Sequence, residues 1–276
     1  MLPTLRRSEL FSLDFVDAAT EADVSAILQS PGELVHRRGD GLPLVVTPNV
    51  DQLVHLAHQA SPEAAAIIAQ AAYVLPDGQP VVWASRLLGA PLRARLAGST
   101  LIADLWPSLL ADSRRVFVVA SSDVIAARVR ADAGVDAALL APMFPAGNRD
   151  AISSFADACA EHIVTHRPEF VFVTLGFPKQ CLLIGDIVER CRAQGVALPL
   201  FLAIGGSFDM YYGIKQRAPQ WVQRIGMEWF YRFVQEPRRL FRRYFVQDPY
   251  FAVLTWREWR KHRAESPSQI RPGQAE

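Results

Sequence analysis

The chain has 276 residues and is 50% hydrophobic, enough to bury the core of one α/β domain or of two small domains. No apolar run reaches 18 residues and no apolar core follows the two N-terminal arginines, so neither a transmembrane helix nor a signal peptide is expected. The net charge is only +1, but residues 215–263 hold 12 Lys or Arg against four Asp or Glu, which favours an acidic partner for this part.

Strand and helix signals alternate along the chain. The first half predicts a strand at 10–16, a helix at 21–29 capped by Thr20, a strand at 42–46, a helix at 50–59, a strand at 72–75, and helices at 80–88 and 99–112. The second half predicts strands at 115–120, 137–141, 169–175 and 199–204, and helices at 122–133, 150–166 and 178–194.

The predicted strands are near-continuous apolar runs without period-two alternation. That pattern is typical of a mainly parallel, Rossmann-like sheet covered by helices on both faces. Ligands of such sheets bind beyond the carboxyl ends of the strands. Polar or glycine clusters follow four strands, and we expect them to share one edge: Thr47 with Asn49, Asp77, 176–180 and 205–209.

Asp77 stands in Pro-Asp-Gly directly after a predicted strand. Asp-Gly is a common turn pair, and a carboxylate at this edge could also serve as a general base. Thr47 ends a strand, and Asn49 is suited to cap the next helix. Capping does not exclude ligand contact, because the N-terminus of a helix favours an anion.

Two further strand ends carry glycines. The segment Gly-Phe-Pro-Lys-Gln at 176–180 places a lysine and backbone amides at a helix start, which suits a nucleotide diphosphate. Gln180 could orient a sugar or a base by hydrogen bonding. Gly205 and Gly206 follow the last predicted strand and would allow a ligand to approach backbone N–H groups closely.

The C-terminal segment mixes arginines with aromatic residues, and 12 of the chain's 27 aromatic residues lie within 221–259. Pro237 should divide this segment into two helices, the second with Arg239, Arg242 and Arg243 on one face. A solvated basic face is one interpretation. The other is contact with lipid phosphates or a membrane surface, which arginines among aromatic rings favour.

The segments RAPQW, GMEWFYRF, QEPRR and RRY between 217 and 244 resemble the closing signature of the WecG/TagA/CpsF glycosyltransferases (glycosyltransferase family 26). The resemblance is colinear from about Thr47 to Tyr244. It implies inverting, metal-independent transfer from a UDP-sugar donor to a polyprenyl-diphosphate-linked sugar, without a cofactor, in assembly of a surface polysaccharide. Histidines and acidic residues form no HExxH or convincing Asp-x-Asp motif, in keeping with metal independence.

The resemblance also implies roles for individual residues. Asp77, in LPDG, matches the proposed catalytic base, Thr47 and Asn49 match residues lining the active site, and Arg95, in RARLAGSTL, matches an arginine linked to the acceptor phosphates. Donor-binding residues would be Gly176, Pro178, Lys179, Gln180, Gly205, Gly206 and Asp209. Arg232, Arg239, Arg242 and Arg243 would contact the acceptor diphosphate and the membrane.

Two positions depart from the family pattern. Thr100 replaces an aspartate, and Cys181 replaces a glutamate, which suggests a different donor sugar or weakened activity. No partnered histidine accompanies Cys181 in the sequence, which disfavours a nucleophilic thiol, and the spacing of Cys159, Cys181 and Cys191 indicates reduced thiols rather than metal ligands. A non-catalytic family member and a nucleic-acid-binding protein that uses the basic C-terminal segment are the alternatives.

The expected organisation is a catalytic core at 1–213, a helical appendage at 214–263 and a polar, disordered tail at 264–276. The expected location is the cytoplasm, peripheral at the inner face of the cytoplasmic membrane. No nucleic-acid partner is expected, and the sequence leaves a homo-oligomer open.

Overall fold

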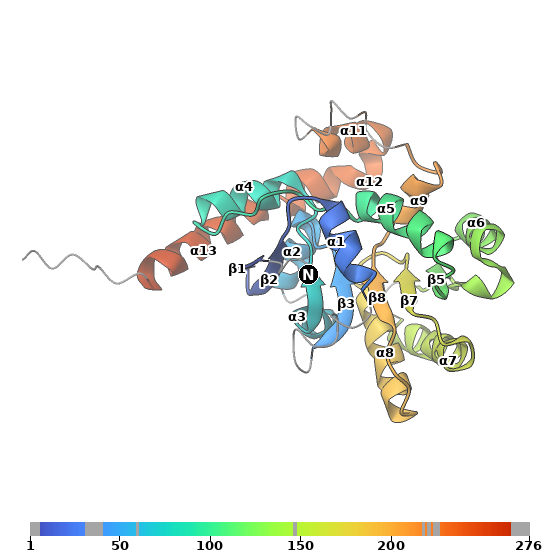
Figure 1. The fold of residues 1–276 in the computed structure, drawn as a ribbon. Coiled ribbons are helices and arrows are strands. Elements are labelled where there is room, and N and C mark those ends of the chain that lie inside the picture. Colours follow the sequence, from blue (N-terminus) through green and yellow to red (C-terminus); the bar gives the residue numbers. More distant parts are fainter. Residues whose placement is uncertain are drawn as a thin grey trace, which may run out of the picture.

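The computed structural model of the protein describes residues 6–30, 41–58, 61–145, 148–216, 219, 222 and 227–265. Most of the RAPQW motif and of the expected polar tail lies outside these residues. Within them, eight strands form one sheet in the order β1-β2-β4-β3-β8-β7-β5-β6 (Figure 1). The strands are β1 (Arg6–Leu10), β2 (Leu13–Asp17), β3 (Leu42–Val46), β4 (Ala71–Val74), β5 (Val116–Ala120), β6 (Ala138–Leu140), β7 (Phe170–Val173) and β8 (Leu200–Ala203).

All strand pairs are parallel except β1 with β2, which confirms the predicted mainly parallel sheet. The helices of the first half are α1 (Glu21–Leu28), α2 (Val50–Ala57), α3 (Pro62–Ala69), α4 (Gln79–Leu87), α5 (Gly98–Ala111) and α6 (Asp123–Ala133). Those of the second half are α7 (Arg149–His166), α8 (Lys179–Ala193), α9 (Ser207–Tyr211), α11 (Glu228–Gln235), α12 (Pro237–Arg242) and α13 (Tyr250–Glu265), with a π-helical turn at Arg243–Gln247.

Two predictions near the N-terminus were incomplete. The single strand expected at 10–16 is a hairpin, because Phe11 and Ser12 both adopt positive φ angles (53° and 58°) and reverse the chain. Such angles are unusual without glycine or asparagine, so the turn has no clear sequence signal. Helix α3 was not predicted, although Pro62 at its start is a common helix signal.

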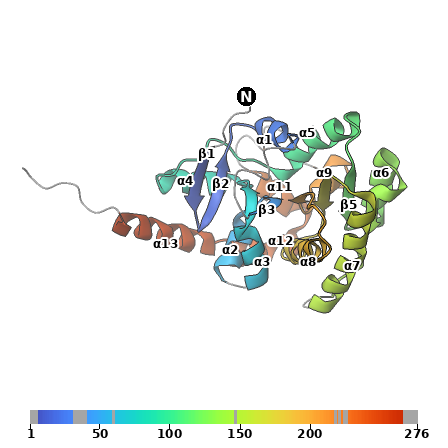
Figure 2. The same cartoon turned by 60° about the horizontal axis from the view of Figure 1, so that its bottom comes forward.

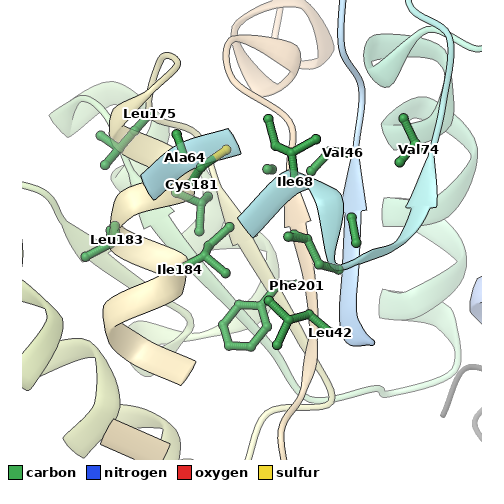
Figure 3. Close-up of a cluster of buried hydrophobic side chains, with 14 of the residues drawn as sticks. Leu42, Val46, Ala64, Ile68, Val74, Leu175, Cys181, Leu183, Ile184 and Phe201 are labelled. Atoms are coloured by element: carbon green, nitrogen blue, oxygen red, sulfur yellow. The ribbon is translucent and has the colours of Figure 1, made fainter. Parts of the chain in front are cut away.

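Helices cover both faces of the sheet, as predicted. Phe170 and Phe172 of β7 pack with buried side chains of α1, α5, α6 and α9, whereas Val171 and Val173 pack with those of α2, α3, α7 and α8. Figure 3 shows part of this second core. Because successive strand residues alternate between two buried faces, the strands carry no polar alternation.

The C-terminal segment is helical and divided at Pro237, as predicted. Helix α13 packs against α2, where Tyr250 stacks on His58 with ring centroids 4.2 Å apart. Phe251 is only 8% exposed and its ring centroid lies 5.3 Å from that of Phe11. No helix in the described part of the chain is long and apolar enough to span a membrane.

Candidate active site

Four neighbouring strands, β4, β3, β8 and β7, end at the same level. Val46 pairs with both Val74 and Ala203, and Ala203 pairs with Val173. The segments after these four residues carry the predicted clusters and therefore lie side by side at the carboxyl edge of the sheet. The expectation that the four clusters share one edge is confirmed. Figures 1 and 2 show α4 and α9 leading away from this edge.

A backbone hydrogen bond links the turn after β3 to the turn after β4. The backbone N–H of Asp77 donates to Pro48 O at 3.2 Å, and Asp77 is half-buried. Asn49 caps α2: its side chain accepts from Gln52 N at 3.2 Å, and the Gln52 side chain accepts from Asn49 N at 3.3 Å. The predicted cap is thus confirmed, and it holds the turn of Thr47 next to that of Asp77.

The segment that carries Arg95, directly before α5, lies against the same turns. The N–H of Leu96, the next residue, donates to Pro76 O at 2.8 Å, which fixes this segment against the Asp77 turn. Arg95 is half-buried. Thr100, which replaces the family's aspartate, lies in the first turn of α5. The structure therefore brings the Arg95 segment, Asp77 and Thr47 together, although they are widely separated in the sequence.

The glycine turn after β8 is fixed by Gln180. Gly205 has a φ of +52°, which favours glycine, and its N–H donates to Gln180 Oε1 at 3.1 Å. Gln180 is only 3% exposed. Its observed role is to position the turn, and direct contact with a donor sugar or base stays a prediction. Gly206 is exposed and so available to a ligand.

Lys179 begins α8, directly after Pro178, and its ammonium group donates to Phe144 O at 2.8 Å. An ammonium group has three N–H donors, so this bond leaves donors for an anion. Gly176 is exposed, with no atom within 4 Å of the position that a Cβ would take. Asp209 forms an ion pair with Lys215 at 3.3 Å, which closes the loop around α9. The donor-binding roles of all four residues stay predictions.

Cys181 does not face this edge. Its side chain is fully buried in the apolar core, close to Ala64 and Leu175 in Figure 3. Burial raises the pKa of the Cys181 thiol to about 12, so the thiol is protonated at neutral pH. The suggestion that position 181 reads the donor sugar is therefore not supported, and a nucleophilic role is excluded on the same ground.

The four C-terminal arginines can be placed only by their backbone. Arg232 lies in α11, Arg239 and Arg242 lie in α12, and Arg243 begins the π-helical turn. Their side chains lie outside what the structure describes. The expectation that Arg239, Arg242 and Arg243 share one face therefore stays a prediction. The π-helical turn and α13 both contact α2, the helix that Asn49 caps.

A pocket of about 460 Å³ lies at the other edge of the sheet, near the start of β5. Its lining includes Arg114, Arg115 and His162. Arg114 and Arg115 both form ion pairs with Glu169, so this one carboxylate offsets part of their charge. Desolvation lowers the pKa of His162, helped by the neighbouring His166. This pocket is remote from every predicted site residue, and its chemistry indicates no defined ligand.

The sequence analysis assigned no role to Gly98 or Ser99, and it placed Ser207 at the carboxyl edge only as part of the cluster 205–209. A Cβ on Gly98 would lie 2.9 Å from Ser207 Oγ and 3.3 Å from Thr47 Oγ1. The first turn of α5 therefore touches the strand ends of both β3 and β8. The only available signal was a glycine followed by serine at the start of a predicted helix, which is too common to single out.

Comparisons with known proteins show the family of the chain. Residues 15–265 match the sequence model described as "Glycosyl transferase WecG/TagA/CpsF family". The N-acetylglucosaminyldiphosphoundecaprenol N-acetyl-beta-D-mannosaminyltransferase of Bacillus spizizenii (strain ATCC 23059 / NRRL B-14472 / W23) is 32% identical over 232 residues, 82% of each chain. Proteins of the same name from Bacillus subtilis (strain 168) and Staphylococcus aureus (strain MW2) are 32% and 29% identical, over 63% and 71% of this chain and 64% and 73% of their own.

Proposed function

The chain belongs to the WecG/TagA/CpsF family and is a glycosyltransferase, and from this premise we propose that it transfers a sugar from a UDP-sugar to a polyprenyl-diphosphate-linked acceptor. The product would serve assembly of a surface polysaccharide. The observation that carries the proposal is the meeting of Asp77, Thr47, the Arg95 segment and the Gly205 turn at the ends of adjacent parallel strands. In open α/β sheets this edge is where ligands bind.

Asp77 is the proposed general base. Its carboxylate takes the proton of the acceptor hydroxyl while that oxygen forms a bond to the anomeric carbon of the donor sugar. The bond from this carbon to the UDP oxygen breaks, and UDP leaves with the bonding electrons. A single displacement of this kind inverts the anomeric configuration. The hydrogen bond from Asp77 N to Pro48 O and the one from Leu96 N to Pro76 O support the role by holding the base in place.

Charge on the departing UDP needs stabilisation as the bond breaks. The exposed backbone of Gly176 and Gly206 and the remaining donors of Lys179 are suited to this, because they lie at the ends of the adjoining strands β7 and β8. Metal independence remains part of the proposal. It is supported by the protein's own hydrogen-bond donors at the site, which can stabilise the charge on the diphosphate in place of a metal cation.

The relatives' names narrow the substrates. Their acceptor is N-acetylglucosaminyldiphosphoundecaprenol and the transferred group is N-acetyl-beta-D-mannosaminyl. We therefore expect an N-acetylhexosamine donor and an acceptor with a lipid diphosphate. An acceptor of this kind resides in a bilayer, so the basic, aromatic C-terminal helices would hold the protein at the inner face of the cytoplasmic membrane.

A panel of UDP-sugars tests this function. The purified protein is mixed with each donor and a synthetic N-acetylglucosaminyl-diphosphate lipid, and both the lengthened lipid and free UDP are quantified. At least one donor should give the two products in equal amounts. Absence of transfer with every donor, despite calorimetric binding of UDP, would favour a non-catalytic family member. Salt-sensitive binding of DNA without any binding of UDP would favour the nucleic-acid alternative.

A further inference from the structure

The first turn of α5 presents backbone donors to the carboxyl edge. Helix α5 is 14 residues long and begins at Gly98, after Ala97, which offers no side-chain cap. The N–H groups of Thr100 and Leu101 both donate to Ala97 O. Within the described residues, the N–H groups of Gly98 and Ser99 have no acceptor. Both residues are buried, so this turn combines two backbone donors without a protein acceptor with the positive end of a helix dipole.

The Thr47 side chain points at the same turn from another strand end. Its Oγ1 and Cγ2 atoms lie 3.3 Å and 3.5 Å from the position that a Cβ on Gly98 would take. Thr47 is only 8% exposed, and in the part of the chain that the structure describes its hydroxyl has no hydrogen-bond partner. This oxygen is not among the fully buried side-chain atoms that lack a partner in the described residues, so solvent can reach it and a ligand or a water can bind it.

Ser99 adds a second hydroxyl of the same kind. It is also 8% exposed and has no hydrogen-bond partner among the described residues. Ser207 differs, because its hydroxyl donates to Ile204 O at 2.7 Å, which fixes the wall opposite Gly98. A side chain on residue 98 would collide with this wall, so glycine is what allows the helix to start here.

We propose that the first turn of α5 and the hydroxyl groups of Thr47 and Ser99 bind a phosphate group of a diphosphate-ester substrate. Two backbone N–H groups and two hydroxyl groups suit the several acceptor oxygens of a phosphate. The assignment rests on the proposed glycosyl transfer, in which both the donor and the acceptor carry a diphosphate. The turn lies near Asp77 through the Leu96–Pro76 hydrogen bond, as transfer at the neighbouring sugar requires.

Calorimetry with inorganic pyrophosphate, UDP, uridine and farnesyl diphosphate tests the proposal on the full-length protein. Thr47→Val removes the hydroxyl while keeping the shape, and Thr47→Ser restores it. Ser99→Ala is compared with Ser154→Ala, which changes an exposed serine on α7. Thr47→Val and Ser99→Ala should each weaken pyrophosphate binding about tenfold or more, whereas Thr47→Ser and Ser154→Ala should not. Uridine has no phosphate, so its affinity should be unchanged.

The two diphosphate ligands identify the source of the phosphate. A loss confined to UDP assigns the turn to the donor, and a loss confined to farnesyl diphosphate assigns it to the acceptor. If pyrophosphate alone binds, with the same dependence on Thr47, the phosphate site stands while the proposed glycosyl transfer fails. Unchanged affinity of Thr47→Val and Ser99→Ala for all phosphate ligands, or an equal loss for uridine, would overturn the proposal.

Discussion

Gln180 and Cys181 are neighbours in the sequence but serve different parts of the molecule. Gln180 reaches the carboxyl edge and holds Gly205, whereas Cys181 lies in the apolar core beneath the edge. At the start of α8 successive side chains point about 100° apart, so only one of the two can face the site. A departure from a family pattern therefore changes the chemistry of the site only if its side chain faces that site.

Cys181→Glu should lower stability without changing the preference among UDP-sugars. A carboxylate buried without a partner should cost on the order of 3 kcal/mol, well above the cost of the size control Cys181→Ala. Burial would raise the pKa of the new carboxyl above its unfolded value of about 4.3, so the variant should gain stability as the pH falls from 8 to 5. Urea denaturation at both pH values measures this. A stable variant with an altered donor preference would contradict this prediction and would show that residue 181 affects donor binding.

Residue roles were predictable where they depend on local chemistry. Asn49 before a helix predicted its capping bond, because the cap is formed within four residues. The contact of Thr47 with Gly98 and the bond between Gln180 and Gly205 were not predictable. Each joins two segments that are far apart in the chain, and nothing in the sequence around Thr47 or Gln180 indicates which distant residue it will contact.

At the scale of elements, α3, α7 and α8 are held together by one arginine. Arg149 of α7 makes two hydrogen bonds to Asp186 of α8 and also contacts Glu63 of α3 at 2.8 Å. Asp186 is only 5% exposed, whereas the Glu63 side chain is 65% exposed. The two contacts should therefore differ in energy, because solvent screens the outer pair.

Arg149→Met should cost about 2–4 kcal/mol of unfolding free energy, since it leaves the Asp186 carboxylate buried without its partner. Glu63→Gln should cost less than about 1 kcal/mol. Adding Asp186→Leu to Arg149→Met should recover part of the loss, because no unpaired charge remains. Chemical denaturation of the three variants decides this, and equal effects of Arg149→Met and Glu63→Gln would contradict the assignment.

Helix α13 was expected only as part of a helical appendage, yet Phe251 contributes to the main core. Phe251→Ala should therefore cost about 3 kcal/mol. Trp256→Ala changes a larger ring on the same helix that is 52% exposed, and it should cost far less. Thermal denaturation compares the two. A smaller loss for Phe251→Ala than for Trp256→Ala would mean that α13 is not anchored through Phe251.

The order of elements was largely predictable, because apolar runs mark buried strands and a 3.6-residue period marks helices. The N-terminal hairpin was missed because its turn uses Phe11 and Ser12 in a conformation that favours glycine. The boundary expected after residue 213 remains a prediction. Tyr250 and Phe251 nevertheless show that chain beyond it packs on α2 and on the hairpin turn.

The whole molecule combines an acidic first part with a basic C-terminal part at one end of the sheet. Figure 1 shows α11 and α12 on the side of the sheet from which α9 leaves β8. This places the arginine-bearing helices on the side of the candidate active site. A lipid-linked substrate could then enter the site while its lipid chain remains in the bilayer.

The double change Arg239→Ala/Arg242→Ala should weaken binding to anionic vesicles, by about 1 kcal/mol for each arginine, and more visibly at low salt. The charge-matched control is Arg128→Ala/Arg192→Ala, which removes two exposed arginines from α6 and α8. Vesicle sedimentation measures both pairs. If the two pairs behave alike, membrane attraction depends on total charge rather than on the C-terminal helices.

Whether the edge around Asp77 is the catalytic centre is tested most directly by Asp77→Asn, assayed for transfer and for UDP binding in the same preparation. The amide keeps the shape of the side chain but cannot accept the acceptor's proton. Turnover should fall roughly 10²–10⁴-fold, while UDP affinity should change little. Turnover close to that of the unaltered enzyme would remove Asp77 from the mechanism and contradict the assignment of this edge as the active site.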